Sequence, residues 1–409
     1  MKRLAIPLAF ALLSCAHHDD HAGESIEQRY LDDPSFRRAE LETSLVTRDN
    51  GYARLRLAHY GTQDDHDWDH AREWNPVVEP VVDGVALDAS LGPTARALDL
   101  ASPSLGRDAF ARYPVQLLSS VERAHALSDY GVWRDDSRGI GGLVRARLAD
   151  GSSGVFLTCS SCHARVDDAG HLVDGLPNVH LDLGRLAYDT SSTKDARVLS
   201  WGPGRLDVTS NDGSEPVRIP DLRPIRWLTH LHADGNVVQR DLVVLAIRIE
   251  TLILTSHHEL LRPPREVALS LARYLWSFAD TAPSPSTTDE AVRQGASIFD
   301  ARCAACHAPP GFTGPPIALD VVGTDPTIGR SLDRATGFYR VPSLRFVGTR
   351  GPLLHDASLP SLEALFDPTR LDAGYRGGTY GAGSVGGHRF GLDLVASERA
   401  ALIAYLKSL

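Results

Sequence analysis

Two pentapeptides carry residues whose types and spacing suit the binding of a redox cofactor: Cys159-Ser-Ser-Cys162-His163 and Cys303-Ala-Ala-Cys306-His307. Each follows the pattern C-x-x-C-H, which attaches a c-type haem. The two thiols bond to the vinyl groups of one porphyrin, and the histidine becomes the proximal ligand of its iron. Zinc sites and redox dithiols also use paired cysteines, but neither needs a histidine directly after the second one. The sequence therefore predicts two covalently bound haem c groups, with His163 and His307 on their irons.

The axial positions of each iron decide what such a haem can do. Two protein ligands make an electron relay, whereas an open position can bind peroxide or dioxygen. Met1 is the single methionine, so no methionine of a mature chain can be a ligand. Downstream of the second motif the candidates are His355 and His388, and His388 lies in the glycine-rich stretch 374–391. That loop can fold over the haem, although the spacing alone equally fits a surface histidine.

Cys15 is the one cysteine outside the two motifs. It follows a basic start and an apolar run too short to span a bilayer, as in a secretory signal. Leu12-Leu-Ser-Cys15 resembles a bacterial lipobox, which predicts a signal peptide over residues 1–14 and a lipid on Cys15; a plain secretory signal is the alternative. We therefore expect an exported protein on the periplasmic side, attached to a membrane only through this lipid. Ala16, rather than aspartate, after the cysteine favours the outer membrane.

The charge balance restricts the partners. Without Lys2 and Arg3 of the predicted signal peptide, the chain has 40 Lys and Arg against 52 Asp and Glu, a net charge of −12. Such an acidic chain argues against nucleic-acid binding. It is compatible with docking of a basic redox partner, although mild acidity is also common among soluble proteins.

Composition and helix signals divide the chain into segments. We expect a flexible tether at residues 15–30, a mixed segment of unknown role at 31–103, a linker at 281–288, and haem c domains at 104–280 and 289–409. The second domain is bracketed by helices at 290–302 and 397–406, as in a cytochrome c. The fold class is thus predicted to be mainly α, with two cytochrome c-like haem domains packed together behind a mixed N-terminal segment.

Local patterns predict further elements. Apolar residues at helical spacing indicate helices over 104–129, 237–261 and 265–279. Alternating apolar and polar residues indicate a strand at 52–58, and the glycine-rich stretch 139–154 indicates a hairpin-like connection. A carbonyl near Pro177 is expected to accept a hydrogen bond from the ring of His163, because such bonds orient axial imidazoles.

The C-terminal part resembles a known family. The stretch from Phe338 to Glu363 contains Val-Pro-Ser-Leu-Arg and His355-Asp-Ala357-Ser, and is similar to the C-terminal signature of the bacterial di-haem cytochrome c peroxidase/MauG superfamily, with Ala357 where Gly is usual. Gly387-His388-Arg-Phe-Gly resembles the region that supplies the sixth ligand of the second haem. Relatives place Met, Tyr or His there, so the resemblance implies His388 as that ligand and His355 as a residue near haem.

The N-terminal half has a weaker resemblance. Trp201-Gly-Pro-Gly-Arg205-Leu-Asp207 and Leu231-His232-Ala233-Asp234-Gly-Asn236 are similar to stretches of rubber-oxygenase-like di-haem c-type cytochromes, with Ala233 where Trp is usual. Together the two resemblances cover about residues 130–409.

The superfamily implies roles for the two haems. Its N-terminal haem is catalytic and its C-terminal haem transfers electrons, and related peroxidases hold a calcium ion between them. By this resemblance the His163 haem is the reactive centre. Its sixth position is open or filled by one of the candidate histidines His180, His230, His232 and His257. We assign His232 and Asp234 to the catalytic pocket, and Arg205 to a haem propionate, a pairing that guanidinium groups make well.

Three functions fit these observations. The first is reduction of hydrogen peroxide at the N-terminal haem with electrons from a small cytochrome c or cupredoxin; the distal glutamate signature of the peroxidases is not evident here and counts against it. The second is a non-catalytic electron-transfer cytochrome, with both irons six-coordinate. The third is a rubber-oxygenase-like dioxygenase that acts on an apolar or phenolic substrate and has a large apolar pocket.

Overall fold

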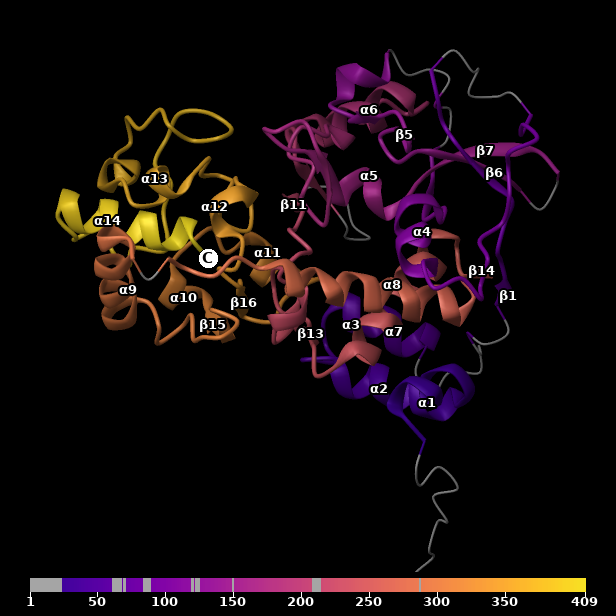
Figure 1. Cartoon of the computed structure of the whole chain (residues 1–409), viewed down its shortest axis with the longest axis horizontal. Helices are drawn as coiled ribbons and strands as arrows, with labels where there is room; N and C mark the ends of the chain where they lie inside the picture. Colours follow the sequence, from indigo (N-terminus) through magenta and orange to yellow (C-terminus); the bar gives the residue numbers. More distant parts are fainter. Residues whose placement is uncertain are drawn as a thin grey trace, which may run out of the picture.

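Figure 1 shows the computed structural model, in which residues 24–60, 68, 71–83, 90–118, 121, 126–148, 151–207, 215–286 and 288–409 are described. The predicted signal peptide and the predicted lipid site at Cys15 lie outside these residues. Residues from α9 (Glu290–Arg302) onward form the second half and gather at the left of Figure 1. The part before α9, which carries the first motif, is the first half and lies at the right. Nowhere in the described ranges does a helix have the length and hydropathy that a bilayer crossing requires.

The fold is helix-rich but not purely α, so the expectation of a mainly α protein is confirmed in part. Short strands form several small sheets. The largest of those described joins β2 (Val78–Pro80), β6 (Val144–Arg147), β7 (Ser153–Leu157) and β3 (Gln116–Leu117), in that order. β6 and β7 form an antiparallel hairpin, so the predicted connection at 139–154 is confirmed. This hairpin leads directly into the first motif, whereas the second motif follows a helix.

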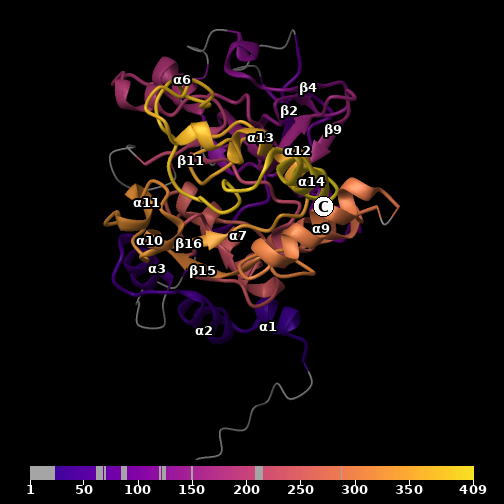
Figure 2. The ribbon, with the colours of Figure 1, turned by 90° about the vertical axis from the view of Figure 1, so that its left-hand side faces the viewer.

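The segment before residue 103 belongs to the core of the first half. Its helices are α1 (Ile26–Asp32), α2 (Pro34–Ser44) and α3 (Gly51–Tyr60). Their buried aromatic residues join one hydrophobic cluster with α7 (Leu242–Ser256) and α8 (Arg265–Ser277). Tyr30 is fully buried in it, so residues 26–30 are part of a packed helix and not of the predicted tether. Figure 2 shows α1 and α2 beneath the remainder of the molecule.

Two predicted elements were wrong. Residues 52–58 form part of α3 instead of a strand, because the side chain of Asn50 accepts a hydrogen bond from Ala53 N and starts a helix. The buried residues Tyr52, Arg56 and Tyr60 recur at helical spacing. Because the buried Arg56 is polar, the sequence shows alternating apolar and polar residues there, which is the pattern typical of a strand. The helix expected over 104–129 ends at Arg112 as α4 (Leu105–Arg112), since Pro114 follows and disfavours helical geometry before it.

The helix pairs of the two halves are alike. α4 crosses α8 at Gly106, where a Cβ atom would lie 2.1 Å from the carbonyl oxygen of Ser270. α9 crosses α14 (Ala396–Lys407) at Gly295, where a Cβ atom would lie 2.0 Å from the carbonyl oxygen of Ala401. Four residues after each glycine a phenylalanine packs on a tyrosine of the partner helix: Phe110 on Tyr274 and Phe299 on Tyr405, with ring centroids 5.6 and 5.4 Å apart. Along the chain, each motif therefore lies between the two helices of a similarly built pair.

A buried carboxylate on α7 allows a test of how much the contact between α1 and α7 contributes to stability. Glu250 is 1% exposed, and its Oε2 accepts a hydrogen bond of 2.7 Å from the hydroxyl of Tyr30. Replacing Tyr30 by Phe removes this donor but leaves the acceptor buried, so we expect the free energy of unfolding to fall by about 1–3 kcal/mol. Urea denaturation measures the change, with Tyr188→Phe as the control. Equal midpoints for wild type and Tyr30→Phe would contradict the expectation.

Candidate functional site

The first motif forms the short helix α5 (Cys159–His163), which the preceding hairpin holds in place. The Thr158 hydroxyl donates a hydrogen bond of 2.7 Å to the carbonyl of Gly142. Gly142 has φ +62°, and a Cβ atom there would lie 2.2 Å from Ser160 Oγ. Trp133 Nε1 donates to the carbonyl of Ser160 at 3.1 Å. These contacts set the direction in which the two thiols and the imidazole of the motif point.

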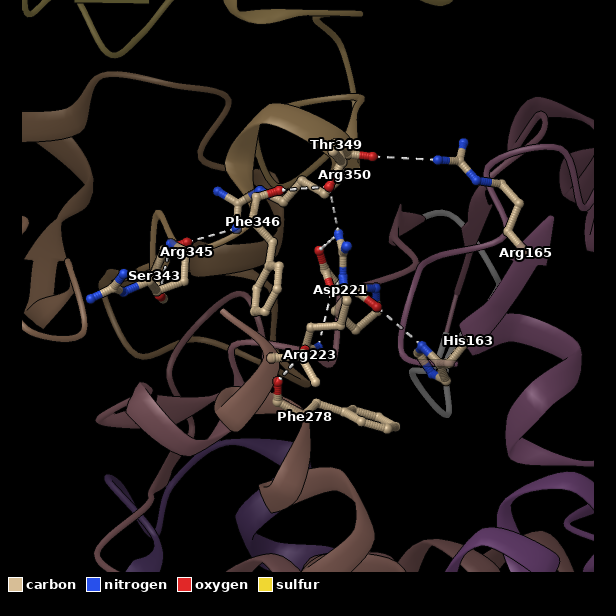
Figure 3. Close-up of polar contacts among 12 residues, drawn as sticks. His163, Arg165, Asp221, Arg223, Phe278, Ser343, Arg345, Phe346, Thr349 and Arg350 are labelled. Atoms are coloured by element: carbon tan, nitrogen blue, oxygen red, sulfur yellow. Dashed lines mark hydrogen bonds and ion pairs between the residues drawn. The ribbon is translucent and has the colours of Figure 1, made fainter. Parts of the chain in front are cut away.

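The ring of His163 is oriented by a backbone carbonyl of a distant segment. Its Nδ1 lies 3.0 Å from the carbonyl oxygen of Pro220 (Figure 3), so Nδ1–H donates this bond and Nε2 is left for a metal. The prediction of a carbonyl near Pro177 as the acceptor was therefore wrong. The segment before Pro177 contacts the backbone of His163 instead, where Gly175 N donates to the carbonyl oxygen of His163 at 2.7 Å. Burial lowers the pKa of His163 to about 4, which keeps the imidazole neutral, as ligation requires.

The second motif repeats this arrangement. Nδ1 of His307 lies 3.1 Å from the carbonyl oxygen of Phe312, so its Nε2 is also left for a metal. Burial lowers the pKa of His307 to about 4 as well. Phe312, which supplies the acceptor, packs against Phe299 of α9 with ring centroids 5.6 Å apart. The helix pair of the second half thus fixes the ligand geometry of the motif.

His388 faces His307. Their ring centroids are 6.5 Å apart. An imidazole nitrogen binds a metal at about 2 Å, and a ring centre lies roughly 1 Å beyond its nitrogen, so two rings that share one metal lie about 6 Å apart. The observed spacing therefore fits a single iron between the two rings.

The backbone around His388 is held firmly in an unusual conformation. His388 has φ +43°, and its N–H donates to the carbonyl of Val322 at 2.6 Å. The fully buried guanidinium of Arg370 donates to the carbonyls of Gly387 and His388 at 2.7 and 2.9 Å. Nδ1 of His388 is buried without a hydrogen-bond partner. The glycine-rich loop therefore presents this imidazole to the cavity through contacts to its backbone.

One cavity of about 580 Å³ is lined by both motifs and by His388. Burial raises the pKa of the first two thiols, Cys159 and Cys162, to about 12, and that of Cys303 to about 11. Such thiols stay protonated at neutral pH, which disfavours the redox dithiol alternative. Thioether bonds to a porphyrin do not need the thiolate to persist, so the site agrees better with haem attachment.

Three arginines in the cavity wall indicate that the site suits an anionic cofactor. Arg350 is buried and Arg218 and Arg340 are half-buried, and none of the three forms an ion pair with a carboxylate in the described part of the chain. Burial lowers the pKa of Arg340 to about 10 and that of Arg350 to about 9. Buried cations need anionic partners. Two haems bring four propionates, so the arginines, the thiols and the imidazoles all fit this cofactor.

His232 and Asp234 lie together in the turn between β12 (His230–Leu231) and β13 (Val237–Val238), and both line the cavity. Nε2 of His232 accepts a hydrogen bond of 2.8 Å from Arg248 Nε. Burial and the neighbouring arginines hold the pKa of His232 well below its usual range. Asp234 is 2% exposed, and burial raises its pKa to about 6. Its carboxylate accepts a hydrogen bond from Asn236 Nδ2.

The remaining predicted residues lie in different places. His355 lines the cavity and stacks on Tyr339, with ring centroids 4.4 Å apart. Arg205 is outside the cavity wall; its guanidinium lies 3.6 Å above the ring of Tyr380, a residue of the glycine-rich loop. The three other candidate ligands of the first haem are also outside this wall: His180, His230 and His257. For a calcium ion such as the related peroxidases hold, which the sequence left open, the described residues contain no group of three His, Cys, Asp or Glu side chains placed to bind a metal.

Comparisons with known proteins complete this description. No protein-family profile matches the chain, and no curated protein matches its sequence. Among solved structures, the chain is similar to a MauG-like protein associated with microbial copper homeostasis. The sequence identity is 19% and the TM-score 0.36, over 51% of this chain and 78% of that protein.

Proposed function

We propose that this chain binds two c-type haems and moves electrons from the His307/His388 site to the His163 site, where hydrogen peroxide is reduced to water. The observation that supports this direction is the difference between the two motif histidines. His307 faces a second imidazole at 6.5 Å, whereas no imidazole of the described residues is paired with His163 in this way. Two filled axial positions suit an electron relay, and an open position suits chemistry.

Residues in the wall of the shared cavity can handle the protons and charge of this reaction. A haem held by Cys159, Cys162 and His163 would supply the two electrons in H₂O₂ + 2 H⁺ + 2 e⁻ → 2 H₂O. Asp234, with a pKa of about 6, can accept and return a proton near neutral pH. Arg248 lines the same cavity and carries a positive charge that stabilises negative charge on a departing oxygen. His232 positions Arg248 by accepting the hydrogen bond from its Nε.

The partner and the location belong to the same proposal. The excess of acidic over basic residues suits a small, basic electron donor, either a cytochrome c or a cupredoxin. Export, a lipid on Cys15 and attachment to the outer membrane follow from the sequence pattern at residues 1–16, and they place the protein where small periplasmic donors occur.

A donor-oxidation assay tests the function. The haem-loaded protein is mixed with a reduced small c-type cytochrome, and hydrogen peroxide is added. We expect catalytic oxidation of two donor molecules per peroxide. Donor oxidation no faster than in the absence of the protein would contradict the proposed reaction.

A non-catalytic electron relay is the second candidate. One observation favours it: His232 lines the cavity that both motifs share, and its Nε2 becomes free to bind an iron once the hydrogen bond from Arg248 is released. A relay would still accept electrons from the donor, but peroxide would not draw them through the protein. The same assay therefore separates the two candidates.

A further inference from the structure

A buried ion pair follows the carbonyl that orients His163. Pro220 accepts the hydrogen bond from Nδ1 of His163, and the next residue, Asp221, is 6% exposed. Its two carboxylate oxygens accept hydrogen bonds from Arg223, at 3.0 Å from Nε and 2.7 Å from Nη2. The backbone N–H of Arg223 donates to the same carboxylate at 3.0 Å. Figure 3 shows the pair between the first motif and the second half.

Arg223 also reaches across to the second half. Its Nη2 donates to Thr349 Oγ1 at 3.1 Å, and its guanidinium lies 4.6 Å above the ring of Phe346. Thr349 belongs to α12 (Val347–Arg350), which also carries the cavity arginine Arg350. At one end the pair is therefore linked to His163 through the neighbouring carbonyl of Pro220. At the other end it is hydrogen-bonded to α12, which forms part of the cavity wall.

The charges of this pair act on the first site with opposite sign. Asp221 also attracts Arg218 and Arg350, but Arg223 is the residue that hydrogen-bonds its carboxylate in the described part of the chain. A negative charge near a metal stabilises the oxidised form, and a positive charge stabilises the reduced form. Burial strengthens both effects because they are poorly screened by water. While Asp221 and Arg223 stay together, each charge offsets part of the effect of the other at His163.

We propose that Asp221 and Arg223 set the reduction potential of the iron held by His163, and that Thr349 ties this setting to the position of the second half. The inference rests on the proposed haem at His163 and adds a control to it: a movement of α12 that draws Arg223 from Asp221 lowers the potential of the first site. Asp221 and Arg223 are positioning residues, since they act through Pro220 and through charge, as outer-shell groups do at metal sites.

Opposite charge removals test this inference. Potentiometric titration of the haem-loaded protein, without peroxide, gives separate potentials for the two haems. We expect Arg223→Met to lower the potential of the His163 haem, Asp221→Asn to raise it, and the double variant to return it close to wild type. The His307 haem is the internal reference and should move less. Arg223→Lys, which keeps the charge, should stay close to wild type.

A surface pair provides the matched control. Arg226 pairs with Asp280 at 2.9 Å on the exposed surface, and Arg226→Met should leave both potentials unchanged. Shifts of Arg223→Met and Asp221→Asn in the same direction, or no shift in either, would overturn the inference and leave a purely structural pair. If Arg223→Met does not fold, Asp221→Asn decides alone by the sign of its shift. Opposite shifts without peroxide turnover would keep the inference and refute the proposed reaction.

Discussion

Asp234→Asn should slow peroxide reduction by about 10²- to 10⁴-fold, the usual contribution of a positioned acid or base, while the absorption spectra of both haems stay unchanged. The carboxyl group is buried in the cavity wall, and its pKa is raised to about 6. Asparagine has the same shape and can keep the contact with Asn236, but it cannot carry a proton. The loss should therefore appear in turnover and not in haem content.

The pH dependence follows from the same group. Because the pKa of Asp234 is raised, the carboxyl is protonated below about pH 6 and ionised above it. Only the ionised form can accept a proton from peroxide, so the rate should rise as the pH passes upward through about 6. This inflection should be absent in Asp234→Asn. The exposed Asp136→Asn is the control, and an Asp234→Asn variant with the wild-type rate would remove Asp234 from the mechanism.

His388→Gly should convert the second haem from low spin to high spin and stop electron transfer from the donor to the first haem. The variant removes the imidazole that faces His307 at 6.5 Å. Its backbone should be preserved because His388 has φ +43°, a conformation that glycine adopts without strain. The change is measured by absorption spectroscopy and by the rate of donor oxidation.

Added imidazole sharpens this test. It should occupy the vacated position in His388→Gly and restore the low-spin spectrum, which a loss of folding would not allow. His180→Gly is the matched control, because His180 is an exposed histidine away from the cavity. A low-spin second haem in His388→Gly, without added imidazole, would mean that another residue is the ligand.

Elements set by local signals were predictable. α8, α9 and α14 begin and end within two residues of the ranges expected from their periodicity, since capping and apolar spacing act over a few residues. α7 begins later than expected, because the side chain of Asp241 accepts hydrogen bonds from Val243 N and Val244 N and so starts the helix there. The pair of α9 and α14 was expected, whereas the pair of α4 and α8 was not, although the repeated Gly-x-x-x-Phe of Gly106–Phe110 and Gly295–Phe299 was a readable signal for both.

Features that depend on distant residues could not be predicted in this way. The acceptor for His163 is Pro220, 57 residues along the chain, and no local pattern marks it. Arg218, Arg340 and Arg350 look like surface residues in the sequence, and only the packing of the chain around one cavity brings them into its wall. For the second site the resemblance selected His388, and the structure places its ring opposite His307. Ligation of iron by these two residues stays a prediction.

Electron paramagnetic resonance of the haem-loaded protein, fully oxidised and then half-reduced, tests the central claim most directly. The account predicts a low-spin signal from the His307/His388 haem and, in at least one of the two states, a high-spin signal from the His163 haem. Replacing His163 should abolish that high-spin signal. Two low-spin signals that persist after half-reduction would contradict an open first site, and the protein would then be an electron relay.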